Sequence, residues 1–491
     1  MAFFAFFLIL CLLLFLPSTN CISSPESQHT QTVRLNHHDT IQAIEDFMAF
    51  DAGQLLQESI QVPATTTTTS SSSSPFQGNY IPVYDIDIFL KSGYEDYRSL
   101  ILFRLARNAK RFEWLSTSLT DSPVDDIPYY YESASYVGIM DIGNPPQRAH
   151  LLIDTGSRFV WWDCQPWNNC PTFSYNPSRS SSYRQVDCRM EGECPGNEGL
   201  FWGCDMDGNN KCEFKVMYRD STEAEGFLAY EKVTTTHGEE GGDVVLVENL
   251  RFGCAEKSPA SMIGKKFTGI LGFGPNTYSF IYQMNATSFS FCPKSHTASV
   301  ATSLYFNSLP IPDDFTFRTP LLQNIQPIYY AVNLTGVYVR WEFLEIKSLT
   351  NSDGRVGAVV DSGTSISMFP LQFYNQFRDT FTRHSQWLSR LPGEQFFDTC
   401  YNISSPEWYL EVPEIIFQFS GVTGHEVLRL DANQIMMPIG TDGKYCLAFS
   451  PTKFRQFTLI GTWQLQGTRV SFDLANQMLQ FDPENCKNSP S

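Results

Sequence analysis

The chain has 491 residues, 42% of them hydrophobic and 14% aromatic, which is enough for one large or two medium hydrophobic cores. Its formal net charge of −18 at pH 7 argues against a nucleic-acid partner, because binding phosphates requires a basic surface. An acidic surface suits a protein that works at low pH, where protonated carboxyls repel one another less, but it also simply confers solubility. Charge alone does not choose between these two interpretations.

The N-terminus begins with an almost wholly apolar run, Met1–Leu16, which is shorter than the ~20 residues that span a bilayer. Pro17–Cys21 follows and is typical of a cleavage region, so we expect residues 1–21 to be a signal peptide. No later apolar run is long enough to span a membrane. The mature protein is therefore expected to be secreted, to the apoplast or alternatively to the vacuole, and to have no membrane contact.

Cysteines and sequons agree with secretion. The chain has thirteen cysteines, eleven of them from Cys164 onward, which behind a signal peptide indicates a disulfide framework with one thiol left over. N-glycosylation sequons begin at Asn285, Asn333 and Asn402.

We interpret residues 22–130 as a propeptide. Residues 22–75 are polar and include a low-complexity Thr/Ser stretch, so they offer little to bury. Tyr97–Leu115 is rich in helix formers and unusually basic for so acidic a chain. Its basic residues are Arg98, Arg104, Arg107, Lys110 and Arg111. This helix either presents a solvated face or covers an acidic cleft by pairing with cleft carboxylates, and Pro123–Pro128 would then be the linker that is cut.

From Tyr129 onward the pattern predicts a β protein with few helices, because short apolar or alternating runs are separated by Gly, Pro, Asn and Asp. The predicted strands are Tyr136–Ile142, Ala149–Ile153, Cys212–Tyr218, Phe227–Val233, Val244–Phe252, Tyr329–Val339 and Val470–Asp473. The best helical candidate is Pro370–Thr382.

Two stretches carry the chemistry, Leu151–Ser157 and Ala358–Ser365. In each, an apolar run typical of a buried strand leads into an Asp, then a hydroxyl residue, a Gly and another hydroxyl residue. The Gly permits a tight turn at the strand end. Two such turns face to face would hold Asp154 and Asp361 within a few ångström, where both cannot ionise and the pair shares one proton. The pair could then act as acid and base together.

An internal repeat supports this pairing. Gly269–Gly274 follows the first Asp turn and Thr458–Thr462 follows the second at a similar spacing. We expect two lobes of one plan, residues 131–325 and 326–491, each donating one Asp.

The chain resembles the pepsin-like aspartic proteases, and among them the nepenthesin-like plant branch. The resemblance runs from about Tyr136 to Cys486 and rests on Ile142–Gln147, Asp154–Ser157 with Trp161, the Cys-rich insert Cys164–Cys204, Tyr218–Ser221, Phe252–Cys254, Phe289–Cys292, Asp361–Thr364 and Phe481–Cys486. After Asp361 there is no room for the ~100-residue insert of the other plant branch. The resemblance implies an all-β, bilobal fold with a long cleft between the lobes. It also implies a monomeric endopeptidase for protein or peptide substrates, without metal or cofactor.

Carried over residue by residue, the resemblance makes Asp154 and Asp361 the catalytic pair. The supporting residues would be Gly156 and Gly363, offering N–H groups to the carboxyls, Ser157 and Thr364, bonding the outer carboxyl oxygens, and Thr155 and Ser362, joining the two turns. A water between the carboxyls would attack the peptide carbonyl, with no covalent intermediate.

The flap departs from the family pattern. Tyr218 would lie on a flap over the cleft, with Trp161 bonding its hydroxyl. Arg219 and Ser221 replace the two glycines of the usual Tyr-Gly-Asp-Gly-Ser, and Thr222 replaces the Ser. Flap flexibility and substrate specificity therefore stay open, with Arg219 either favouring acidic substrates or pointing to solvent.

Family pairing also predicts the disulfides. The expected bonds are Cys164–Cys170, Cys194–Cys204, Cys212–Cys254, Cys292–Cys486 and Cys400–Cys446. Trp167 stands where the family has a third cysteine of the first cluster, and so Cys188 would be the free thiol.

Other hydrolase classes are not favoured, because the chain has no G-x-S-x-G and no H-E-x-x-H motif. The remaining alternative is a catalytically weak or inactive pepsin-fold binding protein, similar to xylanase inhibitors or to receptors of this fold.

Overall fold

Strands dominate the architecture, as the alternating and short apolar runs of the sequence predict. The computed structural model describes residues 32–52, 78–118, 135–164, 175–190, 194, 201–204, 210–217, 223–236, 243–258, 266–310, 312, 316–322, 329–346, 357–403, 410–421, 424–452, 458–483 and 486, without the side chains of 110–118, 201–202, 217, 223 and 425. All of them belong to the unit Thr32–Ser491. Within this part of the chain, no helix is both long and apolar enough to cross a bilayer.

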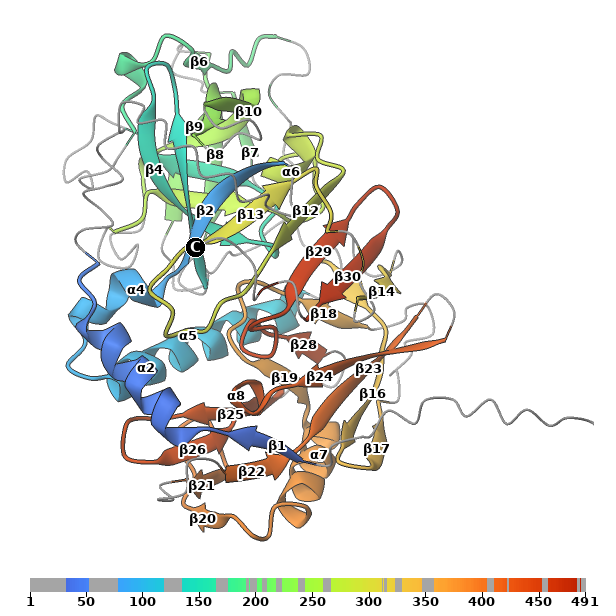
Figure 1. Cartoon of the computed structure of the whole chain (residues 1–491). Helices are drawn as coiled ribbons and strands as arrows, with labels where there is room; N and C mark the ends of the chain where they lie inside the picture. Colours follow the sequence, from blue (N-terminus) through green and yellow to red (C-terminus); the bar gives the residue numbers. More distant parts are fainter. Residues whose placement is uncertain are drawn as a thin grey trace, which may run out of the picture. The chain divides into compact units, whose positions relative to one another are not determined.

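One long sheet contains strands from both halves of the chain (Figure 1). In spatial order it consists of β14 (Phe317–Pro320), β30 (Met478–Asp482), β29 (Arg469–Asp473), β12 (Ser288–Phe291), β13 (Thr302–Phe306), β2 (Asn79–Asp85), β3 (Tyr136–Ile142), β4 (Gln147–Asp154), β11 (Gly269–Gly272), β5 (Val160–Asp163), β10 (Val244–Lys257), β9 (Glu223–Thr235), β8 (Cys212–Met217) and β7 (Phe201–Cys204), with β6 (Arg184–Gln185) on β9.

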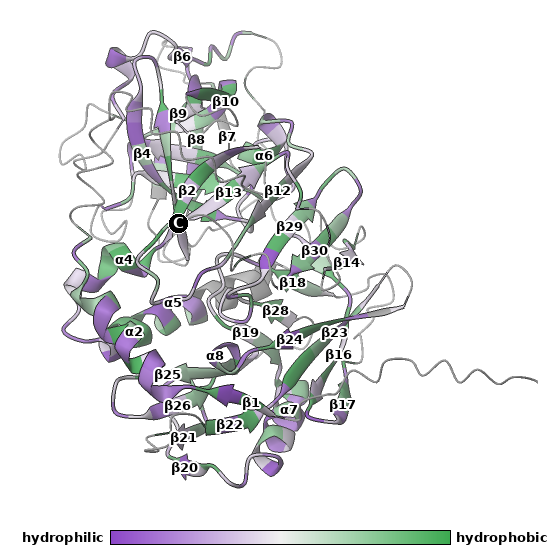
Figure 2. Ribbon diagram, in the orientation of Figure 1, coloured by the Kyte–Doolittle hydropathy of each residue, from purple (hydrophilic) through white to green (hydrophobic). Residues whose placement is uncertain are grey.

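The C-terminal half adds three smaller sheets. They are β15 (Ala331–Val332), β18 (Ala358–Val360), β28 (Thr458–Ile460), β19 (Ser367–Pro370) and β27 (Phe449–Thr452); β17 (Glu342–Glu345), β16 (Leu334–Val339), β23 (Ile415–Ser420) and β24 (His425–Leu430); and β20 (Ser389–Leu391), β21 (Cys400–Asn402), β26 (Lys444–Leu447) and β25 (Met436–Pro438). Strand β23 is hydrophobic over most of its length, as Figure 2 shows, and its inner residues belong to the core.

Short helices connect the strands of these sheets. They are η3 (Pro177–Arg179), α6 (Phe280–Gln283) and α8 (Ala432–Ile435). The longer α7 (Leu371–Arg383) confirms the predicted helix to within one residue at each end. It buries Phe373, Phe377 and Phe381, whose i, i+4, i+8 spacing puts them on one face.

The N-terminal region is more ordered than its composition suggests. It contains β1 (Thr32–Leu35), which pairs with β22 (Leu410–Pro413), then α2 (His37–Ala49), β2, α4 (Asp87–Leu90), η1 (Lys91–Gly93) and α5 (Tyr97–Ser118). The expectation that residues 22–75 have little to bury is wrong for 32–49, because Leu35, Ile44 and Phe47 are at most 1% exposed. These apolar residues are isolated in a polar stretch, so their burial becomes evident only when the surface that they pack against is known.

Strand β2 lies inside the long sheet rather than at its edge. It pairs with β13 on one side and with β3 on the other, and both ladders are antiparallel. Ile81 and Val83 are buried in the same core cluster as Leu304 of β13 and Ile153 of β4. The region that we interpret as a propeptide therefore completes the main sheet in this structure.

The internal repeat appears as one strand motif made twice. In the first half β4 runs parallel to β11, and β5 runs antiparallel to β11. In the second half β18 runs parallel to β28, and β19 runs antiparallel to β28. Asp154 is the last residue of β4 and Asp361 directly follows β18, so both carboxyls leave equivalent strand ends.

Replacing Ile81 with Ala tests whether β2 supports the folded state of the uncleaved chain. We expect Ile81→Ala to lower the free energy of unfolding by about 2–5 kcal/mol, because the site is fully enclosed and leaves a cavity. Chemical denaturation measures this value. Val427→Ala is the control, since Val427 is 41% exposed and should change stability by less than about 0.5 kcal/mol. Equal effects of the two substitutions would contradict a structural role for β2.

Candidate active site

The first Asp turn holds its carboxyl by two hydrogen bonds. The Gly156 N–H donates to Asp154 Oδ1 at 2.9 Å, and the Ser157 hydroxyl donates to Asp154 Oδ2 at 2.5 Å. The backbone closes the turn through the Ser157 N–H, which donates to the Asp154 carbonyl at 3.2 Å. Asp154 is 3% exposed, so its orientation depends on these donors and on the strand that ends there.

The second turn repeats this arrangement bond for bond. The Gly363 N–H donates to Asp361 Oδ1 at 3.1 Å, and the Thr364 hydroxyl donates to Asp361 Oδ2 at 2.6 Å. Its backbone closes through the Thr364 N–H to the Asp361 carbonyl at 3.1 Å. A hydroxyl and a backbone amide thus hold each carboxyl in place. Asp154 and Asp361 therefore receive the same kinds of hydrogen-bond donor from the same sequence motif.

A reciprocal pair of hydrogen bonds joins the two turns. The Thr155 N–H donates to the Ser362 hydroxyl at 3.1 Å, and the Ser362 N–H donates to the Thr155 hydroxyl at 2.9 Å. Both residues are buried. Each side chain satisfies the backbone of the other turn, so the two carboxyls are held in a fixed relation across 207 residues of sequence.

Glycines behind the turns allow the close approach of the neighbouring strands. A Cβ on Gly272 would lie 2.5 Å from the Phe159 carbonyl oxygen, and one on Gly461 would lie 2.5 Å from the Ile366 carbonyl carbon. Both glycines sit at equivalent points of the repeat, which explains the second motif that the sequence shows after each Asp.

Helix α5 contacts both halves of the chain and reaches the second turn (Figure 1). Ile101 and Leu105 pack in a cluster with Ile366 and Trp463, while Leu100 packs in another cluster with residues of the N-terminal half. The side chain of Asn108 accepts a hydrogen bond from the Ser365 N–H at 2.7 Å. A side chain of the N-terminal region thus occupies a backbone donor four residues after Asp361.

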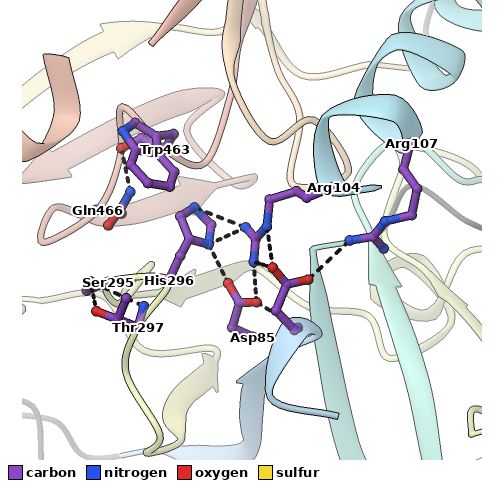
Figure 3. Close-up of polar contacts among 9 residues, drawn as sticks. Asp85, Arg104, Arg107, Ser295, His296, Thr297, Trp463 and Gln466 are labelled. Carbon is purple, nitrogen blue, oxygen red and sulfur yellow. Dashed lines mark hydrogen bonds and ion pairs between the residues drawn. The ribbon is translucent and has the colours of Figure 1, made fainter. Parts of the chain in front are cut away.

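A buried charge cluster fixes α5 beside this contact (Figure 3). Arg104 donates from Nε to Asp87 at 2.6 Å and from Nη2 to Asp85 at 2.5 Å, and Arg107 donates to Asp87 at 3.3 Å. The Arg104 guanidinium also contacts the ring of His296, which bonds Asp85. Arg104 and Asp87 are each 1% exposed.

This cluster corrects the hypothesis that the basic helix pairs with cleft carboxylates. The partners of Arg104 and Arg107 come from the same N-terminal region, at the end of β2 and in α4. Arg98 of the same helix bonds a carboxylate of the C-terminal half, Glu394, at 2.7 Å. The side chains of Lys110 and Arg111 lie outside the described residues. A buried guanidinium needs partners at fixed positions, and a folded segment supplies them more reliably than a substrate cleft does.

The electrostatics of the cluster follow from burial and pairing. Burial alone would raise the pKa of Asp85, but Arg104 and His296 outweigh it and lower that pKa to about 2. Burial lowers the pKa of His296 and Arg104 lowers it further, against the opposite effect of Asp85. Asp85 is therefore ionised over the whole acid range above pH 3, while His296 resists protonation.

Known protein families and proteins match the sequence of this chain over both of the halves that carry an Asp turn. Family profiles described as xylanase inhibitor N-terminal and xylanase inhibitor C-terminal match residues 136–306 and 329–483. The chain is 33% identical over 367 residues to Protein ASPARTIC PROTEASE IN GUARD CELL 2 of Arabidopsis thaliana, covering 72% of this chain and 73% of that protein. It is 28% identical over 397 residues to aspartic proteinase nepenthesin-2 of Nepenthes gracilis, covering 79% and 86%. The chain belongs to the nepenthesin-like plant branch of the pepsin-like aspartic protease family.

Solved structures support the same fold. The crystal structure of edgp superimposes with a TM-score of 0.60 at 18% identity, covering 85% of this chain and 98% of that chain. Basic 7S globulin from soybean gives a TM-score of 0.55 at 17% identity, covering 72% and 94%. At such identities the likeness shows the bilobal, mostly β fold alone.

The flap of this pepsin-like chain lies outside the described residues. Tyr218, Arg219 and Ser221 are therefore not placed here, and their assignment stays a prediction. Trp161 is placed in β5, where it is 1% exposed and belongs to the core cluster of the N-terminal half.

Three of the five predicted disulfides are wrong. The structure joins Cys164 to Cys254, Cys188 to Cys204 and Cys194 to Cys212, in place of Cys164–Cys170, Cys194–Cys204 and Cys212–Cys254. Cys188 is therefore not a free thiol. The structure contains the other two predicted bonds, Cys292–Cys486 and Cys400–Cys446. Cys170 and Trp167 lie outside the described residues.

Strand order explains the altered pairing. Strand β9 lies between β8, which carries Cys212, and β10, which carries Cys254. Two strand spacings are about 9–10 Å, more than the ~7 Å that a disulfide spans between Cα atoms. Cys254 instead lies beside Cys164 at the end of β5, with their Cα atoms 5.4 Å apart.

The three sequon asparagines, Asn285, Asn333 and Asn402, are exposed. Asn285 takes a positive φ of 52° at a turn, and Asn333 donates to the Ser420 hydroxyl at 2.6 Å. Their exposure is compatible with glycosylation, which stays a prediction.

Thr155→Ala tests the reciprocal bonds between the turns. Losing the hydroxyl leaves the buried Ser362 N–H without its acceptor, so the free energy of unfolding should fall by about 1–3 kcal/mol. Thr155→Ser keeps the hydroxyl and should lose less. In a double-mutant cycle with Ser362→Ala, measured by chemical denaturation, the two effects should differ from additivity by about 0.5–3 kcal/mol. Strict additivity would mean that the bonds do not couple the turns.

Peptide mapping of the unreduced protein tests the disulfides. Alkylation without reduction should leave Cys188 unmodified, and a linked peptide should contain Cys188 and Cys204. Recovery of alkylated Cys188, or of a Cys212–Cys254 peptide, would instead support the family pairing. Reduction before alkylation is the control, since it must modify both partners of every bond.

Proposed function

We propose that the protein is a secreted aspartic endopeptidase made in a latent form. The observation that carries this proposal is the matched pair of Asp turns, in which Asp154 and Asp361 receive equivalent donors and Thr155 and Ser362 join the turns. Its relatives named as aspartic proteases support the reaction class.

The chemistry follows from two carboxyls that share one proton. The ionised carboxyl accepts a proton from a water between them as the water attacks the peptide carbonyl, and the protonated one donates to the carbonyl oxygen. Breakdown of the resulting gem-diol protonates the leaving nitrogen. The hydroxyls of Ser157 and Thr364 keep both carboxyls oriented throughout, and no covalent intermediate forms.

Latency is the role that we assign to residues 22–130. Helix α5 packs on the residues that follow the second turn, and its Asn108 occupies the Ser365 N–H. This contact places α5 beside the second Asp turn, where we propose that it hinders the binding of a peptide. Cleavage between α5 and β3, followed by departure of α5, would expose the site.

Secretion and protein substrates complete the proposal. The signal-like residues 1–21, the disulfides among the described residues and the exposed sequons all suit an oxidising compartment, with the apoplast favoured over the vacuole. We propose protein or peptide substrates, a monomer, and no nucleic-acid or membrane partner after signal removal.

The alternative is a pepsin-fold binding protein with weak or no peptidase activity. The family profiles that match this chain are described as xylanase inhibitor domains, which favours this alternative as much as the reaction. A pepstatin-sensitive casein digestion across pH 3–7, on the protein processed between α5 and β3, separates the two. Digestion that pepstatin blocks supports the enzyme, and its absence supports the binding protein.

Asp154→Asn and Asp361→Asn should each abolish acid proteolysis. An amide can neither hold the shared proton nor accept one from water, so kcat/KM should fall by at least ~10²-fold. Casein digestion by the processed variants measures this loss. Asp379→Asn is the matched control, because Asp379 is exposed and lies in α7. Turnover near that of the wild type in either dyad variant would contradict the assignment.

A further inference from the structure

His296 occupies an unusual position in the latent structure. It belongs to the N-terminal lobe, is 2% exposed and stacks on Trp463, with ring centroids 4.8 Å apart and an interplanar angle of 17°. Trp463 in turn donates its backbone N–H to the Ser365 carbonyl at 2.8 Å. His296 is therefore connected through Trp463 to Ser365, whose N–H donates to Asn108 of α5.

The charged groups that face His296 are Asp85 and Asp87 from β2 and α4, and Arg104 from α5. His296 Nδ1 bonds Asp85, and Arg104 Nη1 contacts both ring nitrogens of His296, with Nε2 at 3.2 Å (Figure 3). With a neutral imidazole, the cluster balances the cations Arg104 and Arg107 against these two carboxylates. A second proton on His296 would leave one uncompensated charge in a buried site, directly against a guanidinium.

We propose that His296 is the acid trigger of the latent protein, whose protonation drives Arg104 and the rest of α5 away from the second Asp turn. This inference rests on the latency that we propose for α5. The imidazolium would take over from Arg104 as the cation that pairs with Asp85. This exchange of Arg104 for the imidazolium leaves β2 and α4 in place, because Asp85 keeps a cationic partner after α5 has left.

The sign of the pH effect follows from proton binding. Burial and Arg104 lower the pKa of His296 in the closed state, whereas an exposed His titrates near 6.5. The open state then binds more protons below pH 6.5, so the closed state is favoured above that pH and loses stability as the pH falls through it. Asp85, with a closed-state pKa of about 2, responds only below its ordinary value near 3.8. His296 is therefore the group that acts in mild acid.

Linkage also gives the size of the effect. If the imidazole stays neutral in the closed state down to pH 5, the open fraction should rise by at least roughly 25-fold between pH 7 and pH 5, because pairing with Asp85 can only raise the open-state pKa of His296 above 6.5. A Gln at position 296 still hydrogen-bonds Asp85 but does not titrate. His296→Gln should therefore abolish this rise, and His296→Arg, which carries a permanent cation, should open the helix at pH 7.

Hydrogen–deuterium exchange on the full chain tests the trigger. An Asp154→Asn background prevents self-cleavage, so the measurement does not depend on activity. Exchange of residues 97–109, corrected for its intrinsic pH dependence, reports the opening of α5 between pH 4.5 and 7.5. Exchange of residues 79–85 reports β2, which should stay protected. His384→Gln is the matched control, because His384 bonds Glu342 of β17 in the C-terminal half.

The outcomes are distinct. The proposal is supported if the parent and His384→Gln open α5 on acidification while His296→Gln stays closed. It is overturned if His296→Gln opens like the parent, if β2 loses protection together with α5, or if a folded His296→Arg chain stays closed at pH 7. Should His296→Arg not fold, His296→Gln decides. A failed casein assay would remove the enzyme and leave this result unaffected, so the two hypotheses fail separately.

Discussion

The reciprocal hydrogen bonds between Thr155 and Ser362 are the constraint on which the site depends. Each turn places its hydroxyl where the other turn has a backbone donor, so neither can move without leaving a buried N–H unsatisfied. The repeat of strands around them, β4 with β11 and β18 with β28, brings the turns to the same place. The sheets therefore supply position, and the two hydroxyls supply the fixed relation between the carboxyls.

The local part of this arrangement could be predicted from the sequence. An apolar run, an Asp, a hydroxyl residue and a Gly specify a strand end and its turn within seven residues, and the motif occurs twice. The paired hydroxyls follow from the family resemblance and appear in the structure as expected. Helix α7 was also predictable, because its apolar spacing is regular over three turns.

Features that depend on strand order could not be predicted. The family resemblance pairs Cys212 with Cys254, but the intervening strand β9 separates them, and only the sheet topology shows this. The N-terminal elements were missed for a related reason. Leu35 and Phe47 are isolated apolar residues in a polar stretch, and they count as core only when the surface that receives them is known. The flap falls outside the described residues, so Arg219 stays a sequence-based prediction.

Strand β2 and helix α5 of the N-terminal region are held by different interactions. This difference determines which of the two can leave first. Strand β2 is bonded through its backbone on both edges, so removing it would break two ladders at once. Beyond its apolar packing, helix α5 is held by side chains, chiefly Arg104 and Asn108, whose bonds depend on charge and can be replaced. A single proton on His296 acts on Arg104 and leaves the ladders of β2 intact. An acid-sensitive step therefore begins at α5, while loss of β2 requires the cooperative opening of the main sheet.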